Sequence, residues 1–342
     1  MNISEIARKA NVSRATVSRV INNFSGVKEE TRDRILSIIE EEKYIPNNFA
    51  RSLALSKSYV IGVLVYSIKQ PFWVGIVSEI FDAVFATKYS LFILNSKYEV
   101  NDKAENSYKI NLKKLIQQKV DGIIISLPNR LSEEDIEILH RASMPFVVIQ
   151  DDDYESKRCH SVNVDNTDAA YRLTEIMIQK GHKEIVHFAG GIDNAIAHGR
   201  LKGFTYAMND HYLYLSEQSI INTGSRFIDG YWSMKKLIDT HSKATAVIAY
   251  NDMVAYGAYY AAQEMGIRIP QDISIAGFDG IADEVDFYKL LPDLTTMKQP
   301  IKLLSTSAVT SLLNMIDGVE NDVTDKVYKM EYHPGNTCRE LI

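Results

Sequence analysis

The chain has 342 residues, of which 46% are hydrophobic and 24% charged, values typical of a folded protein with two or three compact units. It contains no run of about 18 apolar residues and no apolar leader segment at the N-terminus, which argues against a membrane span and against secretion. The two cysteines lie far apart without metal-ligand spacing and fit a reducing compartment, so we expect a cytoplasmic protein.

Charge is unevenly distributed along the chain, whose formal net charge is −6. Residues 1–57 contain ten Lys and Arg against seven Asp and Glu, a net charge of +3, and the remainder contains 28 against 37, a net charge of −9. A small basic end on a larger acidic body indicates that any polyanion binds at the N-terminus only.

Three short helices are predicted within the first 45 residues. The segment "SEIARKA" (4–10) has apolar residues at helical spacing, and the following Asn11 tolerates the left-handed backbone of a sharp turn. Ser13 is then a good N-cap for a second helix, and a third helix over 28–42 braces the first two. Two helices joined by so tight a turn predict a helix-turn-helix.

The second helix has two faces of different character. Val17, Val20 and Ile21 form an apolar face that we expect to pack inward. The opposite face carries Arg14, Ala15, Ser18 and Arg19. On an isolated helix such a face is usually solvated surface, but the tight turn and the bracing helix favour contact with a target.

From Pro46 the sequence changes to "PNNFARSLALSKS", which begins with a proline suited to a helix start. This segment is too short and too polar on most faces to form a stable helix alone. We interpret residues 47–58 as a linker that becomes helical only when something holds it.

Strands and amphipathic helices alternate through the rest of the chain. Apolar, β-rich runs lie at 59–66, 90–94, 121–126, 145–150, 183–190, 244–250 and 272–277. This alternation predicts right-handed βαβ units with parallel sheets, and seven strands over about 220 residues suit two α/β lobes better than one. Ligands of such sheets bind beyond the C-terminal ends of the strands, and between two lobes this place becomes a cleft.

Motifs for catalysis and for metal binding are absent from the sequence. The histidines show no H-x-x-x-H spacing, and there is no G-x-S-x-G, no P-loop and no G-x-G-x-x-G after the first strand. The acidic run Asp151–Asp153 could suggest a metal site, but no further metal-ligating residue is predicted to lie near it, which favours a solvated loop. We therefore expect no catalytic residue, no metal site and no cofactor.

Segments along the whole chain resemble the LacI/GalR family of bacterial transcription regulators. They are "ISEIARKANVSRATVSRVINN", "VKEETRDRILSIIEEEKYIPNNFARSL", "NTDAAYRLTEIMIQKGHKEIVHFAG", "RLKGF", "NDMVAYGA", "ISIAGFDG" and "LPDLTTMKQP". The resemblance implies an all-α helix-turn-helix headpiece (1–46), a hinge helix (47–58) and a two-lobed α/β body like the periplasmic binding proteins for effector binding and dimerisation (59–342). It places 59–161 and 292–322 in the N-lobe, and 162–291 and 323–342 in the C-lobe.

The resemblance also implies which headpiece residues contact DNA. Arg14, Ala15 and Arg19 match base-reading positions, since Arg can hold guanine with two parallel hydrogen bonds. The matching phosphate contacts are Ser4, Ser13, Thr16, Ser18, Asn22 and Tyr44. Lys28 is a departure, because many relatives have a hydroxyl residue there that caps the third helix, and lysine cannot cap.

In the linker, Leu53 matches the family's minor-groove wedge, which bends DNA by opening a base step. Asn47 and Arg51 are its candidate minor-groove or phosphate partners. The alternative is that Leu53 merely packs on the body.

For the effector, the resemblance implies residues at strand ends and adjoining loops. The matching residues are Tyr66, Phe72, Trp73, Ser126, Asp151, Arg200, Trp232, Asn251 and Asp279. Asp, Asn and Arg can each bond two vicinal hydroxyls, and an aromatic face packs on a sugar ring, so the set suits a sugar. In the alternatives, Arg200 pairs with Asp279 in a closed cleft, and Trp232 is plain core. Gly280 and Ser126 depart from residues that some relatives use, so they do not identify the sugar.

The resemblance therefore implies a cytoplasmic repressor of a carbohydrate-utilisation operon, not an enzyme, with affinity for double-stranded operator DNA switched allosterically by a small sugar-like effector. Because no leucine heptad precedes the end at "CRELI", we expect a homodimer. The alternatives are an activator or dual regulator that responds to a nucleoside or another non-sugar ligand, a transport-type binding protein, against which residues 1–57 argue, and a sugar-processing enzyme, which needs an acid–base pair.

Overall fold

The computed structural model describes residues 2–22, 24–44, 57–96, 104–150, 159–191, 194–240, 243–283, 290–319 and 324–341. The chain divides into two compact units, Met1–Tyr59 and Val60–Ile342, and each has a buried core of its own. We call the first unit the headpiece and the second the body. No described helix is long and apolar enough to cross a membrane.

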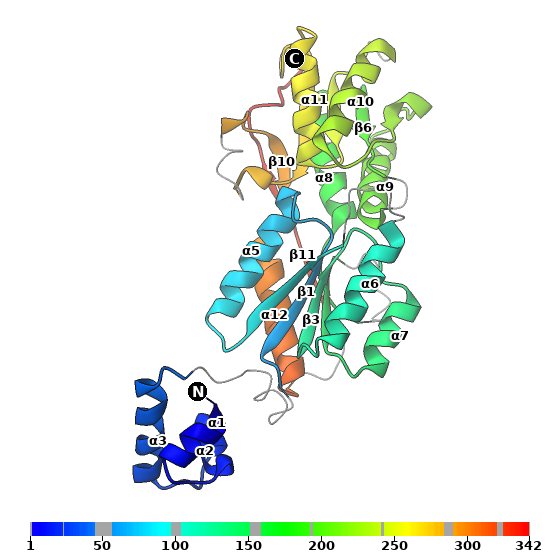
Figure 1. Ribbon diagram of the computed structural model, residues 1–342. Helices are drawn as coiled ribbons and strands as arrows, with labels where there is room; N and C mark the ends of the chain where they lie inside the picture. The colour runs from blue at the N-terminus through cyan, green and yellow to red at the C-terminus, as the bar shows by residue number, and fades with distance from the viewer. Residues whose placement is uncertain are drawn as a thin grey trace. The chain divides into compact units, whose positions relative to one another are not determined.

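Within its described residues the headpiece contains three helices (Figure 1): α1 (Ile3–Lys9), α2 (Arg14–Ile21) and α3 (Glu29–Glu41). Asn11 makes the turn between α1 and α2 with a φ of 52°, the left-handed conformation expected there. Ser13 caps α2, because its side chain accepts a hydrogen bond from the backbone N–H of Thr16. The helix-turn-helix prediction is confirmed.

The apolar side chains of the three helices meet in one small core. Its buried members are Ile6, Ala7, Ala10, Val17, Val20 and Ile35. Ile21, Ile38 and Ile39 pack partly buried against it, as the apolar spacing predicted. Lys28 precedes α3 without a side-chain capping bond, so this helix begins with no hydroxyl cap.

The body contains two sheets, each of six strands within the described residues. The N-lobe sheet, in the order β11-β5-β4-β3-β1-β2, consists of β1 (Val60–Val65), β2 (Ser90–Asn95), β3 (Gly122–Ser126), β4 (Phe146–Ile149), β5 (His160–Val164) and β11 (Asp325–Tyr328). The C-lobe sheet, in the order β12-β10-β9-β8-β6-β7, consists of β6 (Ile185–Phe188), β7 (Ile220–Ile221), β8 (Ala246–Ala249), β9 (Ser274–Asp279), β10 (Thr295–Lys298) and β12 (Glu331–His333). Among the described pairs only β10 and β12 are antiparallel, and the predicted two-lobed α/β fold is confirmed.

The body's helices lie against these sheets (Figure 1). They are α5 (Pro71–Phe85), α6 (Ala104–Gln117), α7 (Glu133–Arg141), α8 (Asn166–Gln179), α9 (Ala195–Asp210), α10 (Phe227–Thr240), α11 (Asp252–Glu264) and α12 (Ile301–Ile316). In the N-lobe, α5 and α12 lie on one side of the sheet and α6 and α7 on the other (Figure 1). In the C-lobe, α8 packs on α9 and α10 packs on α11.

Two glycines from the segments that carry the family resemblance allow these C-lobe helix pairs to approach closely. A Cβ on Gly203 of α9 would lie 2.2 Å from the backbone oxygen of Thr167 in α8. A Cβ on Gly257 of α11 would lie 1.9 Å from the backbone oxygen of Phe227 in α10. Both positions exclude any larger side chain because backbone cannot yield as a side chain can.

The lobe assignment predicted from the sequence is wrong for two strands near the C-terminus, whereas α12 of the range 292–322 packs on N-lobe strands and β12 of the range 323–342 pairs in the C-lobe sheet. The range 292–322 was placed in the N-lobe, but its strand β10 pairs with β9 of the C-lobe sheet. The range 323–342 was placed in the C-lobe, but its strand β11 pairs with β5 of the N-lobe sheet, and β5 itself extends to Val164. β10 ("TTMK") and β11 ("DKVY") are polar, so the sequence pattern carried no signal for their pairing.

Candidate functional site

The face of α2 opposite the headpiece core is exposed. Arg14, Ala15 and Arg19 lie on it, whereas Val17 and Val20 on the other face are buried. Neither arginine takes part in an ion pair with another described residue, so the donors of both guanidinium groups remain available. Such arginines on a helix that fits the major groove can bond guanine O6 and N7.

Two residues that are predicted to contact phosphate are hydrogen-bonded to each other at the start of α2. The hydroxyl oxygens of Ser13 and Thr16 lie 2.9 Å apart, and Ser13 also accepts the capping bond. Ser4, a third such residue, is exposed on α1. Their contacts with phosphate stay predictions, supported by a position beside the arginine-bearing face.

The remaining predicted headpiece contacts are more deeply placed. Asn22 ends α2 and donates from Nδ2 to Ser18 Oγ at 3.3 Å. Tyr44 packs partly buried against the headpiece core. The predicted hinge contacts lie outside the described residues: Asn47, Arg51 and Leu53.

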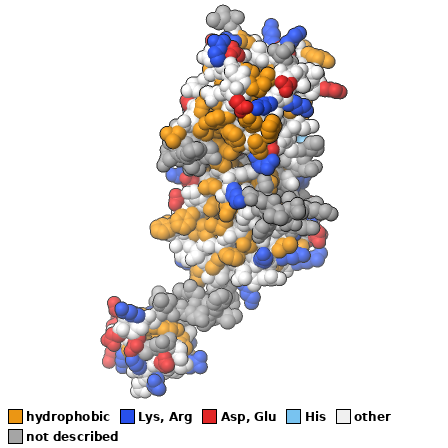
Figure 2. All heavy atoms as spheres, turned by 45° about the horizontal axis from the view of Figure 1, so that its top comes forward, with side chains coloured by type: hydrophobic (Ala, Val, Ile, Leu, Met, Phe, Trp, Pro, Cys, Tyr) orange, Lys and Arg blue, Asp and Glu red, His pale blue; other side chains and the backbone are white. Residues whose placement is uncertain are grey.

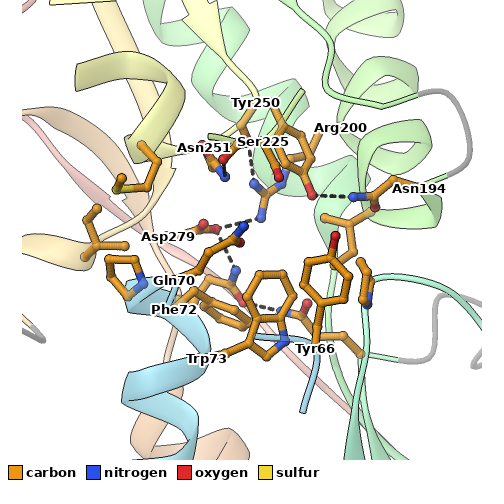
Figure 3. Close-up of a pocket in the computed structure, with 17 residues that line it drawn as sticks. Tyr66, Gln70, Phe72, Trp73, Asn194, Arg200, Ser225, Tyr250, Asn251 and Asp279 are labelled. Atoms are coloured by element: carbon orange, nitrogen blue, oxygen red, sulfur yellow. Dashed lines mark hydrogen bonds and ion pairs between the residues drawn. The ribbon is translucent and has the colours of Figure 1, made fainter. Parts of the chain in front are cut away.

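A cavity that is partly open to solvent lies between the two lobes of the body (Figure 3). Five of its lining residues end a strand or follow one directly, namely Tyr66, Gln150, Tyr250, Asp279 and Gln299, and Asn251 comes directly after Tyr250. These strands belong to both sheets, and their C-terminal ends meet at the cavity, as expected for parallel α/β lobes.

Arg200 of α9 forms the polar floor of the cavity and is 1% exposed. Its Nε donates to Asn166 Oδ1 at 3.0 Å, its Nη1 to the backbone oxygen of Tyr250 at 2.5 Å, and its Nη2 to Asp279 Oδ1 at 2.9 Å. The guanidinium carbon also lies 4.6 Å from the ring centroid of Phe278. Of the alternatives left by the sequence, the structure therefore shows the one in which Arg200 and Asp279 pair.

A chain of hydrogen bonds continues from Asp279 across the lobe boundary (Figure 3). Gln299 Nε2 donates to Asp279 Oδ1 at 2.8 Å, and Gln150 Nε2 in turn donates to Gln299 Oε1. Burial raises the pKa of the Asp279 carboxyl, and the Arg200 charge together with the Gln299 donor opposes that shift. One carboxylate therefore connects an arginine of the C-lobe with an amide at the end of an N-lobe strand.

Aromatic side chains form the N-lobe wall of the cavity. The ring centroid of Trp73 lies 4.9 Å from that of Tyr66 and 5.3 Å from that of Phe72. Trp73 is buried, and its Nε1 has no hydrogen-bond partner among the described residues. The cavity thus faces a ligand with an apolar wall on one side and a polar floor on the other.

The structure brings together six of the nine residues matched to the effector, and these are Tyr66, Phe72, Trp73, Arg200, Asn251 and Asp279. Ser126 is buried at the end of β3 and does not line the cavity. Trp232 was expected in the cleft or in the core and is in neither, since it is 59% exposed on α10 against Tyr231. Asp151 lies outside the described residues.

Several polar lining residues were not predicted from the sequence, among them Gln70, Gln150, Asn194, Ser225, Tyr250 and Gln299. A signal existed for three of them. Gln150, Tyr250 and Gln299 each follow a strand directly, which is where ligands of parallel sheets bind. Asn194 donates to the Tyr250 hydroxyl at 2.7 Å, a contact that only the fold reveals. The described residues contain no group of three His, Cys, Asp or Glu placed to hold a metal ion.

Comparison with known proteins identifies both units. Residues 2–47 match the family model for bacterial regulatory proteins of the lacI family. Residues 58–333 match the model for periplasmic binding proteins and the sugar binding domain of the LacI family. The chain belongs to the LacI family. As a member of the LacI family it is a DNA-binding transcription regulator and not an enzyme.

Individual relatives extend over nearly the whole LacI-family chain. It is 32% identical over 340 residues to the HTH-type transcriptional repressor PurR of Pasteurella multocida (strain Pm70), covering 99% of this chain and 98% of that protein. It is 32% identical over 314 residues to the ribose operon repressor of Haemophilus influenzae (strain ATCC 51907 / DSM 11121 / KW20 / Rd), covering 92% and 91%. The lac repressor dimer bound to operator and the anti-inducer ONPF superimposes with a TM-score of 0.86 at 26% identity, covering 99% of each chain.

Proposed function

We propose that this protein is a cytoplasmic repressor that binds operator DNA as a homodimer and releases or tightens it when an uncharged sugar enters the cavity. The observation that carries the proposal is the buried Arg200–Asp279 pair at the floor of a cavity with an aromatic wall, in a chain that also exposes a basic recognition helix.

The headpiece supports sequence-specific binding through α2. Arg14 and Arg19 are exposed and without ion-pair partners among the described residues, and each can supply about 1–3 kcal/mol of base discrimination. Ala15 between them offers only an apolar contact, as to a thymine methyl. Repression is supported by relatives that are named repressors, including the ribose operon repressor of Haemophilus influenzae.

The body supports a homodimer. Hydrophobic side chains gather on the face of the body shown in Figure 2. On α5, Phe81 is 53% and Phe85 78% exposed, and on β2, at the edge of the N-lobe sheet, Phe92 and Ile93 are also exposed. Exposed apolar patches of this kind mark protein interfaces, and the superimposed lac repressor is a dimer. Two copies would place two recognition helices on half-sites about 34 Å apart.

The lining of the cavity favours an uncharged ligand that donates hydrogen bonds. Arg200 and Asp279 are the charged residues among the described lining, and they neutralise each other. Arg200 is engaged on three sides and 1% exposed, so a phosphate or carboxylate on the ligand meets no available cation. Asp279 accepts two bonds at Oδ1, which leaves Oδ2 to accept from hydroxyl groups. The aromatic wall suits the apolar face of a sugar ring.

A thermal-shift screen in matched pairs tests this assignment: D-ribose with ribose 5-phosphate, D-galactose with galactose 6-phosphate, and adenosine with its monophosphate. An unphosphorylated sugar should raise the free energy of unfolding, by about 2.7 kcal/mol at a hundred times its dissociation constant, and its phosphate should not. The same sugar should change the affinity for an operator selected from random DNA and relieve repression of a reporter. Stabilisation by adenosine alone, or by a sugar phosphate more than by its sugar, contradicts the proposed ligand class.

A further inference from the structure

Asp252 is a buried carboxylate that does not line the cavity described above. It is the first residue of α11, directly after the lining residue Asn251, and it is 2% exposed. It borders a second cavity together with Gly280, Thr296 and Lys298. Burying an acidic side chain outside the effector cavity is costly unless other groups stabilise its charge.

Three donors converge on this carboxylate. Oδ2 accepts from the backbone N–H of Gly280 at 2.7 Å and of Ile281 at 3.0 Å, and Oδ1 accepts from Thr296 Oγ1 at 2.7 Å. The N-terminus of α11 adds a favourable field for a negative group. Burial and the nearby Asp279 charge raise the pKa of Asp252, and the three donors oppose that shift because they stabilise the charged carboxylate.

The turn that Asp252 holds follows directly after Asp279. Asp279 has a φ of 108° and Gly280 a φ of 77°, so two successive residues adopt positive φ, which a residue with a side chain rarely does. Ile281, the second donor to Asp252, is itself a lining residue of the cavity. A backbone so unfavourable persists only where its surroundings impose it, and the two bonds to Asp252 Oδ2 supply that constraint.

The strand beneath is also adapted to the carboxylate. A Cβ on Gly277 of β9 would lie 2.4 Å from Asp252 Oδ1. Glycine at this position therefore leaves the space that the carboxylate occupies between α11 and β9. The hydrogen-bond donors to Asp252 come from the turn after β9 and from Thr296 within the neighbouring strand β10.

We propose that Asp252 is a positioning residue for effector binding: it holds the Gly280–Ile281 turn and thereby orients the Asp279 carboxylate between Arg200 and the cavity. The inference rests on the proposed function of the cavity, in which Asp279 receives the hydroxyl groups of a sugar. The two adjacent residues then have different roles: Asn251 lines the cavity, and Asp252 acts on the cavity through the Gly280–Ile281 turn.

The first experiment measures hydrogen–deuterium exchange of the peptide that contains Gly280 and Ile281 and needs no ligand. Asp252→Ala removes the acceptor of both amides, and their exchange should rise by at least about tenfold. Thr296→Val is the matched control, because it removes the third bond to the same carboxylate and leaves the two turn bonds in place. Unchanged exchange in Asp252→Ala, or an equal rise in Thr296→Val, overturns the proposal.

The second experiment measures affinity for D-ribose, D-galactose and cellobiose in the full-length protein. For the sugar that wild type binds, Asp252→Ala should weaken binding by about tenfold, and should cost nothing further in an Asp279→Asn background, since the two residues act as one unit. Thr296→Val should remain within about twofold of wild type. A full additional loss in the double variant overturns the proposal.

Asp252→Asn and the single variant Asp279→Asn complete the experiment. If Asp252→Ala does not unfold cooperatively, Asp252→Asn replaces it, because its neutral oxygen is a weaker acceptor than a carboxylate. That variant should bind the sugar about threefold more weakly than Thr296→Val, and equal affinities overturn the proposal. Asp279→Asn alone separates the two ideas. If Asp279→Asn leaves sugar binding unchanged, the proposed role of the cavity is contradicted. If Asp279→Asn weakens sugar binding and Asp252→Ala does not, only the proposed role of Asp252 is contradicted.

Discussion

The headpiece and the body differ in where they place their candidate binding residues: on the surface of a helix in the headpiece, and buried in a cavity in the body. On α2 the arginines lie on the outside of a short helix, and the residues that hold the helix are its near neighbours in sequence. In the cavity, Arg200 is 1% exposed, and its partners Asn166 and Asp279 are far away in sequence. A substitution on α2 should therefore affect one contact, whereas a substitution at Arg200 should affect binding and folding together.

This difference is expected from the charge of the partner proposed for each site. DNA is a polyanion in water, so exposed arginines suffice to attract it and to read bases. A small uncharged ligand must be held by groups removed from water, and such groups must first satisfy one another. Variants of the two regions should separate operator binding from ligand response.

The largest effect is expected for Arg14→Ala combined with Arg19→Ala. Each loss removes about 1–3 kcal/mol of base discrimination, so specific operator binding should weaken by about 2–6 kcal/mol while binding to random DNA weakens far less. Fluorescence anisotropy with both DNAs measures the ratio. Arg34→Ala, at an exposed position of α3, is the matched control and should preserve specificity. Equal losses on both DNAs would reduce the pair to phosphate contacts.

Arg200→Met should destabilise the body by about 3–5 kcal/mol, because it leaves the Asp279 carboxylate buried without its cation. The sugar response should disappear as well. Arg226→Met is the matched control, since the Arg226–Asp229 pair is exposed on the arginine side and should contribute less than about 1 kcal/mol. Thermal unfolding and operator binding with and without sugar check both variants. A sugar response that survives in Arg200→Met would sink the assignment of the cavity floor.

A pH dependence is expected from His187 in β6. Burial lowers the pKa of His187 to about 4, below the ordinary value of 6.5, because the imidazole accepts a charge poorly there. The unfolded chain therefore binds a proton that the folded chain does not between pH 6.5 and 4. Stability should fall by about 3 kcal/mol as pH falls through that window.

His187→Gln should flatten this acid limb relative to wild type, measured as the free energy of unfolding by denaturant at each pH. His198→Gln, at an exposed position of α9, should leave the limb unchanged. An acid limb that persists in His187→Gln would show that other groups dominate it.

The smallest effects concern the two tryptophans, both of which the sequence placed in the cleft. Trp73→Phe should weaken sugar binding by about 1 kcal/mol, because Trp73 is part of the aromatic wall of the cavity. Trp232→Ala should change neither sugar binding nor operator binding by more than about 0.5 kcal/mol, because its ring lies on the surface. Isothermal titration of the two variants compares them directly. A larger loss at Trp232 would restore the assignment made from the sequence.

The reason Trp232 was misplaced lies in the helix that carries it. The buried face of α10 consists of Gly230, Ser233, Met234 and Leu237, which recur at helical spacing. Trp232 lies off this stripe, so the helix turns its ring outward. The "GYWS" segment alone does not show which of its residues faces the cavity, because that depends on how α10 packs on α11.

Much of the headpiece could be predicted because its causes are local. Asn11 turns the chain through its own backbone preference, and Ser13 caps the helix that follows it directly. The seven apolar strands were predictable for the same reason, since each carries its β signal within a few residues. The polar strands β10 and β11 were not, because their place depends on a neighbouring strand far away in sequence.

The sequence by itself therefore determined the helix-turn-helix and the two α/β lobes, and its family resemblance predicted that Arg200 and Asp279 lie in the cleft, where both line the cavity. Only the tertiary structure decided that these two side chains neutralise each other, that Gln299 and Gln150 continue the bond chain across the lobes, and that Asp252 holds the turn after Asp279. The physical reason is that buried polar groups must find partners, and those partners are chosen by the fold and not by neighbours in sequence.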